Sequence, residues 1–431
     1  MNSLAKQLTA WRRDLHANPE LGWHEYRTAA RVCDFLSTLP GCKLRVGADA
    51  VSATAGRGAP SPVESAAARA EAIAKGANPR WVEAMGDALT GVVAEWTFPN
   101  PGPTVAFRVD MDALPVSEAG ATTHLPQSGG FVSQNRGRMH ACGHDGHTSI
   151  GLGLASLVES RAAKENWGGR LRIIFQPAEE SCSGAAPMVA AGAVDGVDYF
   201  IAGHLGLTAN ETGLVSCGTE GFLATTKMDV VLRGVAAHAG IKPHEGRNAL
   251  LAAASLTLQL HAITRHGSGD SRVNVGVLQA GSGRNVIADH AELAMEVRGT
   301  TTEINEFMTA EARRIIDATA LAYGVTAEMN VIGAAQSGRC DPELKRVVRE
   351  AAESLPQTRK VVDSLEMTGS EDATFFMNAV QARGGQATYL LIGSALAAGH
   401  HHPAFDFEES ALLHGVELYA AIAKRLLSRS K

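Results

Sequence analysis

Residues 139–148 read Met-His-Ala-Cys-Gly-His-Asp-Gly-His-Thr. The stretch gathers three histidines, a cysteine and an aspartate, in a chain of 431 residues that has only 6 cysteines and 16 histidines. Cys142 and His144 are two positions apart, so in extended backbone their side chains would lean to the same face. Thiolate and imidazole are both good ligands for first-row transition metals. The stretch therefore predicts a metal site; the alternative is a polar loop whose histidines are satisfied by the backbone.

The composition is that of an ordinary globular protein, with 45% hydrophobic and 19% charged residues. The length of 431 residues favours two domains. A net charge of −6 gives no electrostatic reason to expect nucleic acid or an anionic membrane as a partner. The scattered cysteines predict reduced thiols, and no apolar run is long enough to predict a membrane span. We therefore expect a soluble, cytoplasmic protein.

Short apolar runs alternate with helical patterns on both sides of the metal-rich stretch. The predicted strands are residues 91–96, 105–109, 170–176, 199–202 and 387–392. Strands that alternate with helices predict a largely parallel sheet, in which sites collect at the carboxyl ends of the strands. Asp110, Glu179, Glu180 and His204 all lie at such ends. The separate candidates should therefore form a single site.

A different pattern begins near residue 221. Strand and helix signals follow one another in the order βαββαβ, which is that of the split ferredoxin-like unit. The strands are predicted at 227–232, 272–278, 292–298 and 326–332, and the helices at 248–263 and 304–323. We therefore expect residues 221–334 to form a second α+β domain, inserted between residues 1–220 and 335–431 of the first.

Two N-terminal segments fit these patterns less simply. Residues 46–88 shift towards Ala, Gly, Pro and Ser and contain a short helical pattern at 65–75. We interpret them as an insertion, either a surface loop or a lid over the site. Residues 24–28, His-Glu-Tyr-Arg-Thr, resemble the start of the His-Glu-x-x-His zinc motif. Because Thr28 stands where the second histidine should be, this segment is interpreted as a surface helix.

The strong ligand types in the chain describe a centre with two metal ions, in which five ligands are shared. The adjacent glutamates are informative, because successive residues of a strand point in opposite directions. One could bind metal while the other acts as a base, which is what amide hydrolysis requires. Each candidate alone would also fit a solvated turn or a core histidine. The candidates are Cys142, His144, the pair Glu179 and Glu180, His204, and the run 400–402.

Several motifs resemble the amidohydrolase branch of the M20 metallopeptidase family. They are Arg-Val-Asp-Met-Asp-Ala-Leu-Pro at 108–115, the stretch 139–148, Phe-Gln-Pro-Ala-Glu-Glu at 175–180, Ala-His-Ala-Gly at 237–240 and the opening residues 11–22. The resemblance covers almost the whole chain except roughly residues 46–88. It implies an α/β fold, in which a mainly parallel-sheet metallohydrolase domain carries an inserted ferredoxin-like α+β dimerisation or lid domain. The insertion and residues 271–277, 279–286 and 399–401 resemble the branch that hydrolyses p-aminobenzoyl-glutamate.

Matched motif by motif, the resemblance implies that two divalent metal ions are bound, with Mn²⁺ favoured and Zn²⁺ or Co²⁺ as alternatives. Glu179 would be the general base, and Asp112 would orient a metal-bound histidine. His401 is preferred within 400–402 because the family pattern His-x-Pro-x-Phe is placed in register by Phe405. His140 and His147 would support the site from behind. The implied metal ligands are Cys142, His144, Glu180, His204 and His401.

The resemblance also assigns roles to residues of the inserted domain. His238 would reach across a dimer interface to stabilise the tetrahedral oxyanion; the alternative is an ordinary surface histidine. Asn285 and Arg298 would contact substrate, and Arg298 would clamp a free α-carboxylate in bidentate fashion. The turn at 369–372 could supply further backbone N–H donors. Ala288 stands where the family usually has proline, which affects a turn rather than the chemistry.

We therefore expect a dinuclear metal-dependent amidohydrolase that cleaves p-aminobenzoyl-glutamate into p-aminobenzoate and glutamate. Its substrate would be a small N-acyl amino acid, and it would work as a homodimer or as a heterodimer with a paralogous subunit. One alternative is a general N-acyl-amino-acid deacylase of the same family. The other is a catalytically silent partner chain, against which the intact Glu179 and the complete set of ligands argue.

Overall fold

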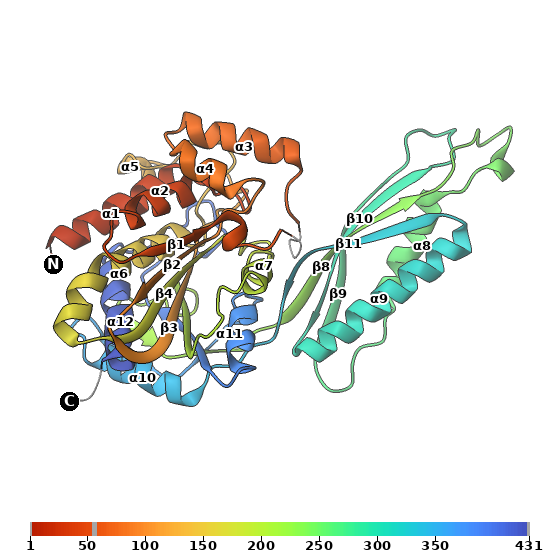
Figure 1. Cartoon of the computed structure of the whole chain (residues 1–431). Coiled ribbons are helices and arrows are strands. Elements are labelled where there is room, and N and C mark those ends of the chain that lie inside the picture. Colours follow the sequence, from red (N-terminus) through yellow and green to blue (C-terminus); the bar gives the residue numbers. More distant parts are fainter. Residues whose placement is uncertain (1, 54–57, 429–431) are drawn as a thin grey trace. The chain divides into compact units, whose positions relative to one another are not determined.

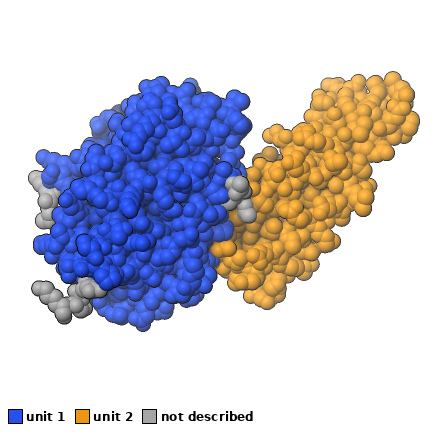
Figure 2. Space-filling model, in the orientation of Figure 1, with its two compact units in different colours: residues 1–220, 338–367, 372–431 blue, residues 221–337, 368–371 orange. Residues whose placement is uncertain are grey.

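The computed structural model describes residues 2–53 and 58–428 (Figure 1). The chain divides into two compact units, which Figure 2 shows in different colours. Unit 1 comprises residues 1–220, 338–367 and 372–431, and unit 2 comprises residues 221–337 and 368–371. All six cysteines are free, as the scattered spacing predicts. Within the described ranges, no helix has both the length and the apolar character that crossing a bilayer requires.

In the described part of unit 1, eight strands form one sheet in the order β1-β2-β4-β3-β5-β14-β6-β12. Neighbours among β4, β3, β5 and β14 are parallel, whereas β1, β2 and the β6–β14 pair are antiparallel. The predicted mainly parallel sheet is thus confirmed, with antiparallel additions towards its edges. Its strands are β1 (Lys43–Val46), β2 (Val92–Thr97), β3 (Asn100–Asp110), β4 (Gly168–Gln176), β5 (Tyr199–Leu205), β6 (Leu214–Ser216), β12 (Lys360–Val362) and β14 (Gln386–Ile392).

Helices cover both faces of this sheet (Figure 1). Helices α6 and α12 lie on one side, pack on each other and contact β3, while α7 and α11 lie on the other side. On the face covered by α6 and α12, buried aliphatic and aromatic side chains of strands and helices form one continuous core. The helices are α1 (Asn2–Ala17), α2 (Tyr26–Leu36), α5 (Leu125–Ser128), α6 (His144–Glu165), α7 (Ala185–Ala190), α10 (Pro342–Glu353), α11 (Thr374–Gln381) and α12 (Ser410–Leu427).

Helix α6 can approach the sheet closely because it carries glycines on its packing faces. A Cβ atom at Gly151 would lie 2.8 Å from Val109 and 2.9 Å from Phe175. A Cβ atom at Gly153 would lie 2.5 Å from Val416. Distances this short are not tolerated between carbon atoms, so a side chain at either position would force the neighbouring side chains to shift. This fit fixes the start of α6 relative to β3 and β4.

The insertion folds as two helices, α3 (Pro62–Ala74) and α4 (Pro79–Met85), and not as a long loop. Residues 54–57 lie outside the described part of the chain. The helices cover α2, because the Tyr26 hydroxyl donates to the Gly86 carbonyl oxygen and Arg27 Nε donates to the Lys75 carbonyl oxygen. The expectation of a surface helix at residues 24–28 was therefore wrong: Glu25 and Tyr26 are fully buried.

Unit 2 has the predicted order βαββαβ. Residues 221–337, all of them described, form an antiparallel sheet of four strands in the order β11-β8-β10-β9. Helices α8 and α9 pack on each other and on this sheet, around an apolar core of their own. The elements are β8 (Ala224–Arg233), α8 (Ala249–His261), β9 (Ser271–Ala280), β10 (His290–Gly299), α9 (Thr302–Tyr323) and β11 (Thr326–Ala335).

Candidate metal centre

Cys142 and His144 are brought to the site by the start of α6. His144 is the first residue of the helix, and Gly143 between them has a left-handed φ of +89°. The assumption that the two residues lie in extended backbone was therefore wrong. A sharp turn, which glycine tolerates, takes the place of the extended backbone. Cys142 Sγ lies 3.5 Å from His204 Nε2, and all three side chains are buried.

The two glutamates lie on a turn that follows β4. Ala178 has a left-handed φ of +52°, and both residues after it leave the strand. Asp112 holds this turn: one of its oxygens accepts the N–H of Glu179 and the other that of Glu180, each at 3.0 Å. The expectation that strand geometry would point the two side chains in opposite directions was wrong. Hydrogen bonds to a distant carboxylate determine the conformation of the turn instead.

Both glutamate side chains nevertheless lie close to His144. Its Nε2 atom is 3.9 Å from Glu179 Oε2 and 3.8 Å from Glu180 Oε1. This Nε2 atom is buried and has no hydrogen-bond partner among the described residues. A buried nitrogen without a partner is costly. An imidazole nitrogen that faces two carboxylates in this way fits a bound cation.

His204 is placed by β5 and by a chain of polar contacts behind it. Its Nδ1 atom lies 2.8 Å from the carbonyl oxygen of Leu205, which leaves Nε2 to face Cys142. His147 Nε2 accepts the N–H of Leu205 at 2.9 Å, and His147 Nδ1 lies 2.6 Å from Asp110 Oδ1. Both ring nitrogens of His147 are thus engaged, and its expected supporting role stays a prediction. The hydrogen bond that Arg108 donates to Asp110 was not predicted. The sequence signal that could have indicated it is a charged residue, Arg108, within an apolar strand.

His401 is the member of the histidine run that faces the other candidate ligands. Its Nε2 atom lies 3.3 Å from Glu180 Oε2, and its backbone N–H donates to Ala141 at 2.7 Å. Its φ of +64° is unusual for a residue with a side chain. His400 Nε2 instead lies 3.2 Å from the carbonyl oxygen of Leu205, and His402 accepts a local backbone N–H.

The centre is strongly negative. Burial, followed by the charges of Glu180 and Glu179, raises the pKa of Cys142 well above its ordinary value. Burial lowers the pKa of His144, but the charge of Asp110 and the other carboxylates outweigh it and raise this pKa to about 10. Bound divalent cations would reverse this balance, because they stabilise a thiolate and displace a proton from imidazole. The electrostatics therefore favour cations.

The ligand atoms form overlapping groups in which all atoms lie within 4.8 Å of one another. A mixed set of thiolate, imidazole and carboxylate suits transition-metal ions, and two groups that share Cys142 suit two ions close together. These side chains therefore fit a dinuclear centre. Three of the groups are Cys142, His144 and His204; Cys142, Glu180 and His401; and His144, Glu179 and Glu180. The other two are Asp110, His144 and His147; and Glu179, Glu371 and Asp372.

Comparison with known proteins agrees with this geometry. Residues 106–425 match the family described as peptidase family M20/M25/M40. The chain belongs to this family. A solved M20 structure from Bacillus subtilis, described as a dinuclear metal-binding peptidase, aligns with a TM-score of 0.66 at 26% identity, covering 99% of each chain. The predicted family and the predicted enzyme class, a hydrolase of the M20 type, are confirmed.

Two relatives resemble this M20 chain over nearly its full length. It is 47% identical over 424 residues to indole-3-acetyl-aspartic acid hydrolase of Enterobacter agglomerans, and 46% identical over 424 residues to a subunit of p-aminobenzoyl-glutamate hydrolase of Escherichia coli. Each match covers 98% of this chain and 96% of the relative. The aminobenzoyl-glutamate utilization protein of Klebsiella pneumoniae aligns with a TM-score of 0.85 at 42% identity, covering 98% and 96% of the two chains.

Three further candidates of this M20 chain lie in unit 2. His238 pairs with Val286 in an isolated β-bridge, and the Ala239 N–H donates to the Asn285 carbonyl oxygen, so His238 and Asn285 lie on adjacent segments. Arg298 is on β10, and its guanidinium makes a bidentate ion pair with Glu296 at 2.9 and 3.1 Å. This pair was not predicted, and it already occupies two donors of the expected substrate clamp.

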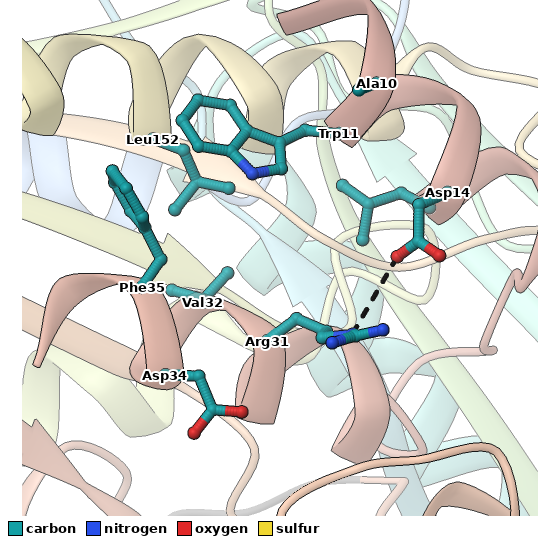
Figure 3. A pocket seen from close by; sticks show the side chains of 9 residues that line it. Ala10, Trp11, Asp14, Arg31, Val32, Asp34, Phe35 and Leu152 are labelled. Carbon is teal, nitrogen blue, oxygen red and sulfur yellow. Dashed lines mark ion pairs between the residues drawn. The ribbon is translucent and has the colours of Figure 1, made fainter. Parts of the chain in front are cut away.

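A separate cavity of about 430 Å³ lies among α1, α2 and α6. Figure 3 shows its apolar side chains Trp11, Phe35, Val32 and Leu152, with Asp34 beside Val32 and with Asp14 paired with Arg31. The candidate metal ligands are not among its lining residues. This cavity is therefore distinct from the metal centre.

Proposed function

We propose that this protein is a dinuclear metal-dependent amidohydrolase that cleaves p-aminobenzoyl-glutamate into p-aminobenzoate and glutamate. The observation that carries the proposal is the position of Glu179. Its carboxylate is buried, and its Oε2 atom lies 3.9 Å from His144 Nε2, within the cluster of candidate ligands. A carboxylate so placed is within reach of a water molecule held in the same cluster.

The cluster would hold two divalent ions, with Mn²⁺ favoured and Zn²⁺ and Co²⁺ as alternatives. When bound, such ions supply Lewis-acid polarisation of the scissile carbonyl and lower the pKa of a water molecule. Asp112 supports both glutamates through their backbone N–H groups. The proposed ligands are Cys142, His144, Glu180, His204 and His401.

Glu179 acts as the general base in this proposal. It takes a proton from the attacking water as the oxygen bonds to the amide carbon, and it returns that proton to the amine nitrogen as the C–N bond breaks. His238 donates a hydrogen bond to the tetrahedral oxyanion, from the second protomer of a dimer. Asn285 contacts the substrate, and Arg298 binds its α-carboxylate after exchanging the Glu296 carboxylate for that of the substrate.

The two relatives narrow the substrate class. Their names pair an aromatic acyl group with an acidic amino acid, as indole-3-acetyl-aspartic acid in one and p-aminobenzoyl-glutamate in the other. Indole-3-acetyl-aspartate is therefore the second candidate substrate, favoured by the 47% identity of its hydrolase to this chain. A general N-acyl-amino-acid deacylase would instead accept acyl groups and amino acids of many kinds.

The assembly is part of the proposal. Residues 221–334 serve as the dimerisation or lid domain, residues 1–220 and 335–431 as the catalytic domain, and residues 46–88 as an insertion in it. The partner is a second copy of this chain or a paralogous subunit. Support for a second kind of subunit comes from the Escherichia coli relative, whose name describes it as one subunit of its hydrolase.

A substrate panel tests the proposal. The protein is reconstituted with Mn²⁺, Zn²⁺ or Co²⁺ and offered p-aminobenzoyl-glutamate, indole-3-acetyl-aspartate, acetyl-amino acids and p-aminobenzoyl-glutamine. Released amino acid is quantified by chromatography, with and without a paralogous chain, and Glu179→Gln protein serves as the blank. The proposal expects the highest kcat/KM for p-aminobenzoyl-glutamate. Equal turnover of acetyl-amino acids would identify a general deacylase, and no turnover with any metal or partner would refute the proposal.

A further inference from the structure

The segment between α1 and α2, residues 19–25, packs against the turn that follows β4. A Cβ atom at Gly22 would lie 3.0 Å from the Cα atom of Ala178, so a side chain there would crowd the turn. Trp23 is buried and donates from its indole Nε1 to Ser183 Oγ at 2.9 Å, on the far side of the same turn. The segment therefore contacts both ends of the turn, at Ala178 and at Ser183.

The strongest contact is made by Glu25, whose side chain is fully buried. Its Oε1 atom accepts the N–H of Ala178 at 2.8 Å, and its Oε2 atom accepts the hydroxyl of Thr90 at 2.7 Å. Asp112 accepts the N–H groups of the next two residues. Two buried carboxylates thus bind three consecutive backbone N–H groups, and the second and third of these belong to the two glutamates of the metal centre.

Helix capping does not explain the position of Glu25. Glu25 is the N-cap residue of α2, yet its side chain makes no capping hydrogen bond. The free N–H groups at the start of α2 are taken by Glu20, whose two oxygens accept those of Arg27 and Thr28 at 2.8 Å each. Glu20 therefore caps helix α2, and the side chain of Glu25 is directed at the turn after β4.

Burying this carboxylate is unfavourable unless its hydrogen bonds compensate. Burial, together with the charge of Asp112, raises the pKa of Glu25 to about 8. The turn it holds is itself unfavourable, because Ala178 adopts a left-handed φ of +52° that residues with a side chain rarely adopt. Such a conformation persists only where surrounding contacts enforce it. Glu25 supplies such a contact at the residue immediately before the proposed base.

We propose that Glu25 is a positioning residue: it holds the Ala178 N–H so that the turn directs Glu179 at the metal centre. The inference rests on the proposed role of Glu179 as the base. It assigns a catalytic contribution to the N-terminal segment, which has no side chain among the candidate ligands. Glu25 acts entirely through the backbone of the turn.

The test compares Glu25→Ala with Glu25→Gln in the metal-loaded, full-length protein. Hydrogen–deuterium exchange reports on the peptide that contains residues 178–180, and kcat and KM are measured with p-aminobenzoyl-glutamate. Glu25→Ala should raise the exchange rate about tenfold or more, because the N–H loses its acceptor. Its kcat should fall about tenfold or more while KM changes by less than about twofold. Glu25→Gln keeps an acceptor oxygen and should stay within about threefold of wild type.

Glu20→Ala is the matched control. It also removes a buried glutamate that accepts backbone N–H groups, but from α2 and not from the turn. It should lower the melting temperature about as much as Glu25→Ala, while exchange at 178–180 and kcat of the folded protein stay unchanged. If Glu25→Ala does not fold, Glu25→Asp, which withdraws the acceptor by one methylene, takes its place.

The inference is overturned if exchange at residues 178–180 is unchanged in Glu25→Ala, or if Glu20→Ala lowers kcat as much. It is also overturned if Glu25→Gln is as impaired as Glu25→Ala, since the acceptor oxygen would then not be what matters. A wild-type protein that hydrolyses none of the panel would refute the proposed function. The exchange measurement needs no activity, so it would still decide whether Glu25 holds the turn.

Discussion

The Nδ1 atom of His144 lies 2.9 Å from the backbone carbonyl oxygen of Asp112. A carbonyl oxygen only accepts, so this nitrogen carries a proton, and when a cation displaces the second proton the lone pair of the ring lies on Nε2. That nitrogen faces Glu179 and Glu180. A residue that fixes the tautomer of an imidazole ligand is the usual support behind a metal-bound histidine. Asp112 therefore serves the proposed centre twice, through its carbonyl oxygen at His144 and through its carboxylate at the turn.

Substitutions of the two adjacent glutamates should have different effects on metal content and on kcat. Glu179→Gln is expected to retain two metal ions and to lose about 10²–10⁴-fold in kcat, because the base is gone and the ligands remain. Glu180→Gln is expected to lose metal, because it removes a ligand. Metal content and kcat are measured on the same preparation. Turnover like that of wild type in Glu179→Gln would exclude Glu179 from the mechanism.

Cys142 belongs to two of the ligand groups, so its loss should affect both ions. Cys142→Ser is expected to lower metal occupancy, because a serine hydroxyl stays protonated where a thiolate would bind. Occupancy is measured by elemental analysis after gel filtration, with Cys217→Ser as the control, since Cys217 is a buried thiol outside these groups. Two tightly bound ions in Cys142→Ser would show that Cys142 is only a neighbour of the site.

The sequence predicts the ligands better than it predicts the conformation that presents them. Cys142, His144, His204 and Glu180 lie in motifs or at strand ends, where local patterns identify them. The turn after β4 could not be predicted, because its conformation depends on Asp112, far away in the chain. Residues distant in sequence meet there only after the sheet has formed.

Contacts between distant parts of the chain also explain the other difference between the prediction and the structure, at residues 24–28. Residues 24–28 have the polar composition of a surface helix, but most of them are buried. The inserted segment covers Tyr26 and Arg27, and the turn after β4 contacts Glu25. The order of strands and helices along unit 2 is predictable, since each element has its own periodicity. The ion pair of Arg298 with Glu296 was not predicted, although residues two apart in a strand share a face.

His147 should matter for metal affinity although it is not one of the proposed ligands. It accepts the N–H of Leu205, beside His204, and is itself bound by Asp110. His147→Ala is expected to weaken metal binding about 10–100-fold, which is the usual effect of substituting a residue that supports a metal ligand. Competition with a chelator measures the affinity. His402→Ala removes a ring that accepts the N–H of Ala404 in its own loop, and it should leave affinity unchanged. Equal losses in both variants would contradict a supporting role.

Arg12 ties α1 to the start of α6 and to the segment before α12. It is fully buried and pairs with Asp145 at 2.9 Å and with Asp406 at 2.5 Å. Arg12→Met should lower the free energy of unfolding by about 3–5 kcal/mol, because buried carboxylates lose their partner. Arg13→Met, which breaks a partly exposed pair with Glu409, should lower it by about 1 kcal/mol or less. Denaturant titration measures both, and a similar loss for the two variants would contradict the assigned role of burial.

The contribution of unit 2 can be tested by mixing two inactive proteins. If His238 serves the active site of a partner chain, His238→Ala and Glu179→Ala proteins should each be nearly inactive alone. In a mixed dimer, one of the two sites combines an intact Glu179 with an intact His238 from the other chain. Because half of the dimers are mixed at equal concentrations, activity should recover towards about a quarter of wild type for a symmetric homodimer.

The expected loss for a missing oxyanion donor, about 10²–10³-fold, leaves ample range to detect this recovery. Exchange of protomers between dimers is verified separately with two fluorescent labels. A mixture of His238→Ala with Cys142→Ser should recover in the same way, because Cys142 and Glu179 both lie in unit 1. A mixture of Cys142→Ser with Glu179→Ala should not recover, since neither chain then offers a complete centre. No recovery with His238→Ala, despite proven exchange, would place His238 at the site of its own chain or outside catalysis.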